Sequence, residues 1–109
     1  MCDHVEPLRY PFDDALRILG RKGAAPVLME LLNGSDRYNT LKQVFPDISP
    51  RTLSARLDEL EKVGLVRRET TLQTPSRVRY ILTEKGDDIR TILRELAGFS
   101  LKWYATSQR

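Results

Sequence analysis

The sequence predicts an α+β fold, mainly α-helical, with a winged helix-turn-helix, a two-stranded β-wing and a long C-terminal helix. Residues 48–83 read ISPRTLSARLDELEKVGLVRRETTLQTPSRVRYILT, a helix with a basic, hydroxyl-rich start that runs into two short strands. Apolar residues before this segment recur at helical spacing, and a further helical pattern follows it. A recognition helix followed by a wing indicates DNA binding and not catalysis.

Size and composition indicate one soluble domain. The chain has 109 residues, of which 40% are hydrophobic and 30% charged, enough for one modest core and unlike a disordered tail. No apolar run approaches the roughly 20 residues of a membrane span, and the N-terminus lacks the order of a signal peptide. The single cysteine, Cys2, cannot form an internal disulfide, so a cytoplasmic location is expected. The net charge of +3 is by itself a weak indication of a nucleic-acid partner.

The chain is expected to begin with an arm and a short helix. Pro7 and Pro11 indicate that residues 1–12 form an extended N-terminal arm. Asp13 favours a helix start, and this helix is expected to end near Gly20. Within a single domain, residues 13–83 are expected to form the winged-helix core and residues 84–109 the C-terminal dimerisation helix.

Two further helices are expected before the recognition helix. The first has Pro26 in its first turn and ends at Asn33 and Gly34, and the second covers residues 39–45 and ends at Pro46. The apolar residues expected to be buried are Val27, Leu28, Leu31 and Leu32 in one helix, and Leu41, Val44 and Phe45 in the other.

The recognition helix and the wing follow without a break. Ser49 is expected to cap this helix, with Pro50 at its first position and Gly64 at its end. Its inward stripe consists of Leu53, Leu57 and Leu60. Residues 65–72 and 78–83 are expected to be strands, joined by a turn at residues 73–76.

A final helix of about 20 residues is expected after Thr83, which caps it. Its apolar face consists of Ile89, Ile92, Leu93, Leu96, Phe99 and Trp103. A helix of this length projects roughly 30 Å, farther than a small winged-helix core can cover. The remaining apolar surface is therefore expected to pack against another subunit.

The outer side of the recognition helix changes character along its length. The first half offers arginine, serine and threonine side chains beside the small Ala55, whereas the second half carries carboxylates, which phosphates would repel. The first half is therefore expected to enter the major groove, where arginine pairs with guanine edges. The alternative is an ordinary amphipathic helix with a charged, solvated face.

The wing and the preceding helix add further candidate contacts. Arg77 and Arg79 are expected to touch the phosphate backbone or a narrow minor groove; the alternatives are a charged, solvated edge strand and, for Arg79, pairing with Glu69. The preceding helix is expected to cross the backbone, although core packing is the preferred interpretation of Tyr38. The expected DNA-binding residues are Asn39, Thr40, Lys42, Ser49, Pro50, Arg51, Thr52, Ser54, Ala55, Arg56, Arg77 and Arg79.

No catalytic, metal or cofactor site is expected. His4 is the only histidine, and no glycine-rich phosphate loop follows a strand. Cys2, Asp3 and His4 are three potential metal ligands at a chain end, which is not a preorganised site. The preferred interpretation of Cys2 is an ordinary terminal residue.

These residues resemble the HxlR-type transcriptional regulators, relatives of the MarR family, over roughly residues 13–100. The matching stretches are RYNTLKQVFPDISPRTLSARLDELEKVGLVRRE and PSRVRYILTEKG, and the second is the more specific. Two positions depart from the family pattern. Gly23 stands where the family usually carries the tryptophan of a Gly-Lys-Trp motif, and Tyr10 or Pro11 stands where many members carry a cysteine.

The resemblance implies a cytoplasmic prokaryotic regulator that binds double-stranded DNA as a homodimer. The family dimer uses the first and last helices, so the expected interface residues are Leu16, Leu19, Ile89, Ile92, Leu93, Leu96, Phe99 and Trp103. The prediction is thus a sequence-specific transcriptional regulator acting on a pseudo-palindromic operator. The alternatives are a winged-helix module that binds proteins without direct DNA binding, and a DNA-binding sensor with a ligand pocket beside the last helix.

Overall fold

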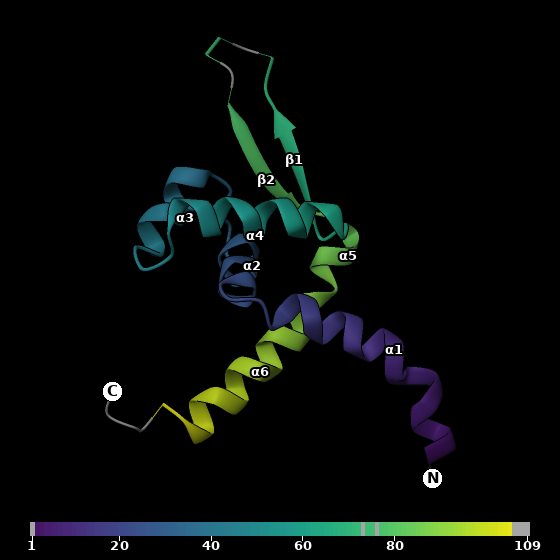
Figure 1. Cartoon of the computed structure of the whole chain (residues 1–109). Helices are drawn as coiled ribbons and strands as arrows, with labels where there is room; N and C mark the ends of the chain where they lie inside the picture. Colours follow the sequence, from purple (N-terminus) through teal and green to yellow (C-terminus); the bar gives the residue numbers. More distant parts are fainter. Residues whose placement is uncertain (1, 73, 76, 106–109) are drawn as a thin grey trace.

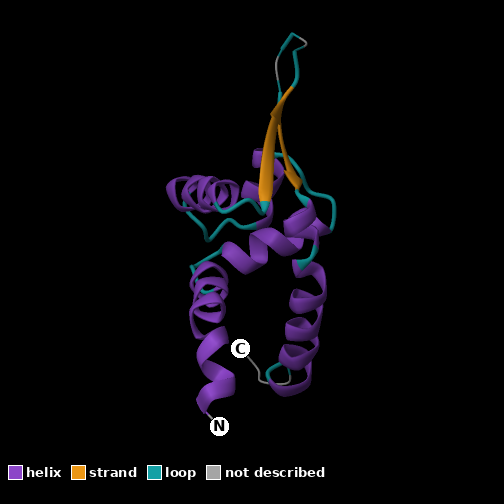
Figure 2. Ribbon diagram, turned by 90° about the vertical axis from the view of Figure 1, so that its right-hand side faces the viewer, coloured by secondary structure: helices purple, strands orange, loops and turns teal. Residues whose placement is uncertain are grey.

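A helical body carries a β-hairpin at one end and two diverging helices at the other. The computed structural model describes residues 2–72, 74–75 and 77–105, with side chains described from residue 11 onward. The elements in chain order are α1 (Cys2–Leu19), α2 (Ala24–Leu32), α3 (Tyr38–Val44), α4 (Pro50–Lys62), β1 (Val66–Thr70), β2 (Val78–Leu82), α5 (Glu84–Asp87) and α6 (Ile89–Trp103). Figures 1 and 2 show the hairpin projecting away from the body, while α1 and α6 extend in the opposite direction. This arrangement confirms the predicted fold class.

Helix α1 is longer than the sequence predicts. It begins at Cys2, so the prediction of an extended arm over residues 1–12 is wrong for the described residues 2–12. Pro7 and Pro11 lie inside the helix. Each proline removes one backbone donor and crowds the carbonyl four residues earlier, and the helix continues past it with a bend. Figure 1 shows such a bend in α1.

The core lies where α2, α3 and α4 meet. Val27 and Leu28 of α2, Leu41 of α3, and Leu53 and Leu57 of α4 are fully buried. The two α4 residues are four positions apart and therefore share one face of the helix. The inward stripe predicted for the recognition helix is confirmed.

Helix α3 buries less than its sequence predicts. Leu41 is buried and Phe45 packs against the core, but Val44 is exposed. Tyr38, Leu41 and Phe45 share a face at spacings of i, i+3 and i+7, and Val44 lies beyond the edge of that face. The prediction that Val44 is buried is therefore wrong.

Helix α2 begins with an unusual backbone conformation. Gly23 precedes it with a φ of 87°, a left-handed conformation that residues with a side chain rarely adopt. A Cβ at this position would lie 3.2 Å from Cδ1 of Ile48. The glycine in place of tryptophan thus lets the turn between α1 and α2 pack closely against the body.

The wing is a two-stranded antiparallel sheet. Val66 pairs with Leu82 and Thr70 with Val78, so both strands are shorter than the predicted residues 65–72 and 78–83. Of the predicted turn, Gln73 and Ser76 lie outside the described residues.

The predicted final helix is divided into α5 and α6 at Asp88. The cap at Thr83 is confirmed, because its hydroxyl accepts a hydrogen bond from the Gly86 amide at 3.0 Å and donates to the Gly64 carbonyl. A Cβ at Gly86 would lie 2.0 Å from the Leu65 carbonyl oxygen. Glycine is therefore required for α5 to sit against the base of the wing.

The molecule is elongated, with extents of 59 × 38 × 23 Å. Figure 2 shows the wing at one end and the start of α1 and the end of α6 toward the other. Over the described residues, every helix is too short or too polar to cross a bilayer.

Candidate nucleic-acid interface

The start of α4 lies on the surface with its cap in place. Oγ of Ser49 accepts a hydrogen bond from the Thr52 amide at 3.1 Å and donates to Oγ1 of Thr52 at 3.0 Å. The Thr52 hydroxyl acts there as an acceptor and keeps its own proton for another partner. Pro50 lies in the first turn, as predicted. A rigid first turn thus presents hydroxyl groups to the outside.

The outward side of α4 carries a cation at its start and a carboxylate farther along. Arg51, Ser54, Ala55 and Asp58 are all exposed. Within the described chain, no residue forms an ion pair with Arg51. Asp58 follows Arg51 by two helical turns and faces the same direction, where its charge repels phosphate. This arrangement favours docking of the first half of α4 on a duplex.

Arg56 is already engaged within the protein. Its Nε donates to the Lys22 carbonyl oxygen at 2.8 Å, and its Nη1 donates to Oε1 of Glu59 at 3.1 Å. Only 15% of its side chain is exposed. The expected contact between Arg56 and DNA stays a prediction, which these two bonds disfavour.

A groove between α3 and the wing brings together residues that are distant in the sequence. It has a volume of about 540 Å³ and is lined by Arg37, Tyr38, Asn39, Thr40, Pro75, Arg77 and Val78. Asn39 and Thr40 of α3 thus share one space with Arg77 of the wing, although each was predicted separately. Lys42 is half-buried on the same helix. These donors suit the phosphate oxygens of a nucleic-acid backbone.

Arg37 was not among the predicted binding residues. Its position directly before α3 was the only indication in the sequence. That Arg37 and Arg77 line the same groove depends on how the wing packs beside α3. The guanidinium lies 3.8 Å from the Asp36 carboxylate, a loose pair that leaves donors for another partner.

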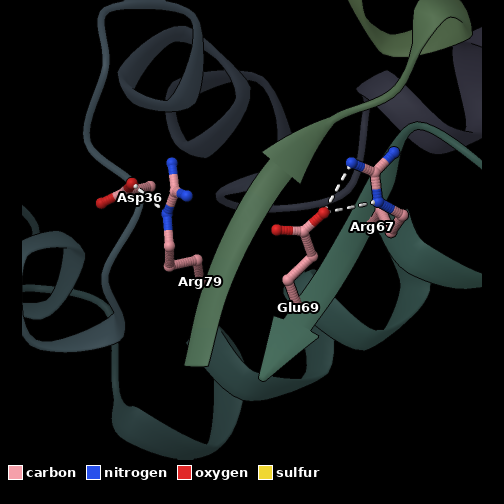
Figure 3. Close-up of polar contacts among 4 residues, drawn as sticks. All are labelled: Asp36, Arg67, Glu69 and Arg79. Carbon is pink, nitrogen blue, oxygen red and sulfur yellow. Dashed lines mark hydrogen bonds and ion pairs between the residues drawn. The ribbon is translucent and has the colours of Figure 1, made fainter. Parts of the chain in front are cut away.

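Asp36 attaches the wing to the loop between α2 and α3. Nε of Arg79 donates to Oδ2 of Asp36 at 2.9 Å (Figure 3), and the Tyr80 amide donates to the Asp36 carbonyl at 2.9 Å. Glu69 faces Arg79 in the strand register but accepts from Nη2 of Arg67 at 2.8 Å. The alternative that Arg79 pairs with Glu69 is therefore wrong. The Arg79 guanidinium positions the wing and is less available to DNA than that of Arg77.

Tyr38 connects two helices of this surface. Tyr38 packs against the core, as its preferred interpretation held, and its hydroxyl donates to the Pro50 carbonyl at 3.3 Å. The start of α3 is thereby linked to the start of α4.

The Tyr80 hydroxyl on β2 has a shifted pKa. Burial raises the pKa of Tyr80; the Arg68 guanidinium lowers it, and carboxylates of α4 raise it further. Tyr80 thus remains neutral near pH 7.

The chemistry of this surface is that of hydrogen-bond donors and cations. Guanidinium, amide and hydroxyl groups match the acceptors of phosphates and base edges. In the part of the chain that the structure describes, no three His, Cys, Asp or Glu side chains are grouped to hold a metal ion. The side chains of Cys2, Asp3 and His4 lie outside that part, so their interpretation stays a prediction.

The residues predicted to form a subunit interface fall into two groups. Ile89 and Leu93 are buried in the core of the subunit itself, and Leu19 packs partly against it. The others are exposed, namely Leu16 on α1 and Ile92, Leu96, Phe99 and Trp103 on α6. We call these four α6 residues the apolar stripe. The exposed group forms the kind of surface that marks an interaction site.

An apolar pocket lies between α1 and the α5–α6 segment. It has a volume of about 210 Å³ and is lined by Ala15, Ile18, Leu19, Leu65, Lys85, Asp88, Ile89 and Ile92. The sensor alternative placed a ligand in this region. Ile92 belongs both to the pocket wall and to the apolar stripe, so the pocket opens beside the predicted subunit interface.

Comparison with known proteins gives one consistent result. The sequence model of the family described as HxlR-like helix-turn-helix matches residues 18–108. The HTH-type transcriptional regulator YvaP of Bacillus subtilis (strain 168) is 39% identical over 92 residues, covering 84% of this chain and 85% of YvaP. The HTH-type transcriptional regulator YodB of the same strain is 31% identical over 100 residues, covering 92% of this chain and 83% of YodB.

Solved structures are similar to this chain over most of its length. The redox regulator HypR in its oxidized form superposes with a TM-score of 0.79 at 30% identity, covering 84% of this chain and 95% of HypR. The reduced form of YodB from B. subtilis superposes with a TM-score of 0.80 at 27% identity, covering 91% of this chain and 97% of YodB.

Proposed function

The chain belongs to the HxlR-like helix-turn-helix family of transcriptional regulators, and we propose that it binds a pseudo-palindromic DNA operator as a homodimer. Its relatives carry names of transcriptional regulators and not of enzymes. The proposal places the protein in the cytoplasm, together with the DNA that it regulates.

One observation carries the DNA-binding part of the proposal. The start of α4, the start of α3 and the wing lie next to one another, because Tyr38 bonds to Pro50 and also lines the groove that contains Arg77. The outward Arg51 and the wing Arg77 have no ion-pair partner among the described residues. Two cations without ion-pair partners among the described residues, on adjoining elements, suit a duplex, in which the major groove is flanked by phosphate backbones.

Each part of the surface has a role in the proposal. Arg51, with the hydroxyls of Thr52 and Ser54, contacts base edges in the major groove, and the small Ala55 allows the helix to approach closely. Arg77 holds the flanking phosphate backbone. Contacts with the DNA phosphate backbone are also assigned to the polar residues of α3 and to the first residues of α4 with their cap. These residues are Asn39, Thr40, Lys42, Ser49 and Pro50.

The homodimer part rests on the apolar stripe of α6 and on Leu16 of α1. These side chains are about half exposed or more in the subunit, and a second copy would remove them from water. In such a dimer the two α4 helices are expected to lie about 34 Å apart, one turn of duplex. Two copies of one surface then meet two half-sites of the operator.

The first experiment compares binding to the DNA upstream of the protein's own gene with binding to a random duplex. Fluorescence anisotropy at two salt concentrations measures both affinity and salt dependence. We expect tight, strongly salt-dependent binding and a clear preference for the upstream DNA. Equal binding to both would indicate an architectural protein or an operator elsewhere. Lack of binding to either at low salt would favour the protein-interaction module.

A further inference from the structure

The Arg56 side chain joins the recognition helix to the turn that follows α1. Its Nε donates to the Lys22 carbonyl and its Nη1 to Oε1 of Glu59. The other carboxylate oxygen of Glu59, Oε2, lies 3.4 Å from Nη2 of Arg21. Arg56 and Glu59 of α4 are therefore tied to two consecutive residues of the α1–α2 turn. We call this set of contacts the turn clamp.

The surroundings of the clamp make it more than a surface ion pair. Arg56 is largely buried, at 15% exposure, and Glu59 is 30% exposed. The turn lies directly against Arg56, because a Cβ at Gly23 would be in ordinary van der Waals contact with Cγ of Arg56, at 3.7 Å. A largely buried guanidinium that bonds a carbonyl and a carboxylate has a fixed orientation.

Beyond the clamp, α1 and α4 face each other across open space. A hollow of about 420 Å³ separates them, lined by Asp14, Arg17, Ile18, Glu59, Val63 and Lys85. Glu59 thus belongs both to the wall of this hollow and to the clamp. The clamp therefore contributes to fixing the angle between α1, which the proposed dimer uses, and the helix that enters DNA.

We propose that Arg56 and Glu59 are positioning residues that set the recognition helix relative to α1, and that Arg56 makes no contact with DNA. The inference rests on the proposed function, since it concerns how that DNA surface is held. In a dimer, the spacing of the two α4 helices depends on their angle to the interface helices. Loosening the clamp therefore reduces the preference for the operator while leaving the number of phosphate contacts unchanged.

The test compares Arg56→Gln, Glu59→Gln and their double variant with Arg77→Gln, the reference for loss of a phosphate contact. Anisotropy titrations over a range of salt concentrations give the affinity for operator and for random DNA. They also give the salt slope, which is the change in the logarithm of the affinity with the logarithm of the salt concentration. We expect each clamp variant to lower the operator-to-random ratio about tenfold with an unchanged salt slope. The double variant should lose less than the sum of the single losses, because the two residues act as a unit. Arg77→Gln should reduce the slope by about 0.9 per subunit.

A reduced salt slope for Arg56→Gln, with equal losses on operator and random DNA, would overturn the proposal. So would an unchanged operator preference in both clamp variants. Thermal unfolding checks that each variant is folded, and Arg56→Lys, which keeps the charge but cannot make both bonds, replaces an unfolded Arg56→Gln. Failure of the unaltered protein to prefer an operator would instead refute the proposed function, and with it the role of the clamp in recognition.

Discussion

The arginines near the proposed DNA-binding surface differ in the bonds that they already make within the protein. Arg56 and Arg79 each bond to a carboxylate of the protein, whereas Arg51 and Arg77 form no ion pair with another described residue. A guanidinium that must break internal bonds before it reaches DNA loses part of the free energy that the new contact provides. The two unpaired arginines are therefore the better candidates for direct contact.

Replacement of Arg51 by alanine tests this distinction for α4. We expect Arg51→Ala to weaken operator binding by roughly 1–3 kcal/mol if the side chain pairs with a base edge, with little effect on random DNA. The matched control is Lys62→Ala, which removes a cation from the last turn of the same helix. Equal losses on operator and random DNA for Arg51→Ala would reduce its role to a phosphate contact.

At the scale of elements, the wing is held by more than its own two strands. The Asp36 carboxylate and carbonyl bind Arg79 and the Tyr80 amide, so β2 is attached to the loop before α3. Their sequence neighbours Arg37 and Val78 line the groove that Arg77 shares with Asn39. The angle of the wing, and with it the shape of the groove, therefore depends on one aspartate.

Loss of the Asp36 carboxylate should affect DNA binding more than stability. The Asp36–Arg79 pair is partly exposed, so we expect Asp36→Ala to cost less than about 1 kcal/mol in the free energy of unfolding. The wing loses a fixed orientation, and operator affinity should fall about threefold. Urea unfolding and anisotropy titrations measure the two effects.

Glu69→Ala is the matched control for this prediction. It breaks the Arg67–Glu69 pair on β1, which is likewise partly exposed but has no bond to the loop before α3. Loss of a carboxylate by itself lessens the repulsion of phosphate, so it should not weaken DNA binding. An equal loss of DNA affinity in the two variants would mean that any disturbance of the hairpin, and not its attachment to the loop before α3, explains the effect.

At the scale of the whole molecule, apolar surface is distributed unevenly. The body buries its apolar side chains, while α6 leaves the apolar stripe in water beside the buried Ile89 and Leu93. One helix thus has a covered half and an uncovered half. Because Leu93 belongs to the subunit core, a truncation of α6 would unfold the subunit as well as separate a dimer, so a point substitution is the sharper test.

Leu96→Glu is expected to convert the proposed dimer into monomers. A carboxylate buried in an apolar interface is costly, and we expect the dimer dissociation constant to rise by about 100-fold. Leu96 is 49% exposed in the subunit, so the monomer should remain folded. Analytical ultracentrifugation measures the association and circular dichroism the fold.

Leu101→Glu provides the same chemical change elsewhere on α6. Leu101 is 68% exposed and lies about 140° around the helix from Leu96. The dimer should persist in this control. A Leu96→Glu protein that still sediments as a dimer would refute the proposed interface.

The sequence by itself determined the order of the elements and most of their ends. Ser49, Pro50, Gly64 and Thr83 act through bonds or backbone angles within a few residues, so local chemistry was sufficient to predict the recognition helix and its caps. The stripe containing Leu53 and Leu57 was predictable for the same reason, since helical spacing selects a buried face. Prolines in α1 misled this reasoning, because they weaken a helix without always ending it.

Only the tertiary structure decided which charged side chains are available. The Lys22 carbonyl that binds Arg56 and the Asp36 carboxylate that binds Arg79 lie 34 and 43 positions away in the sequence, and no local pattern specifies such pairs. The same holds for the groove that joins Arg37 and Asn39 to the wing. Local signals specify helices and strands, but the difference between arginines that bond within the protein and those available to a partner arises only when distant segments pack together.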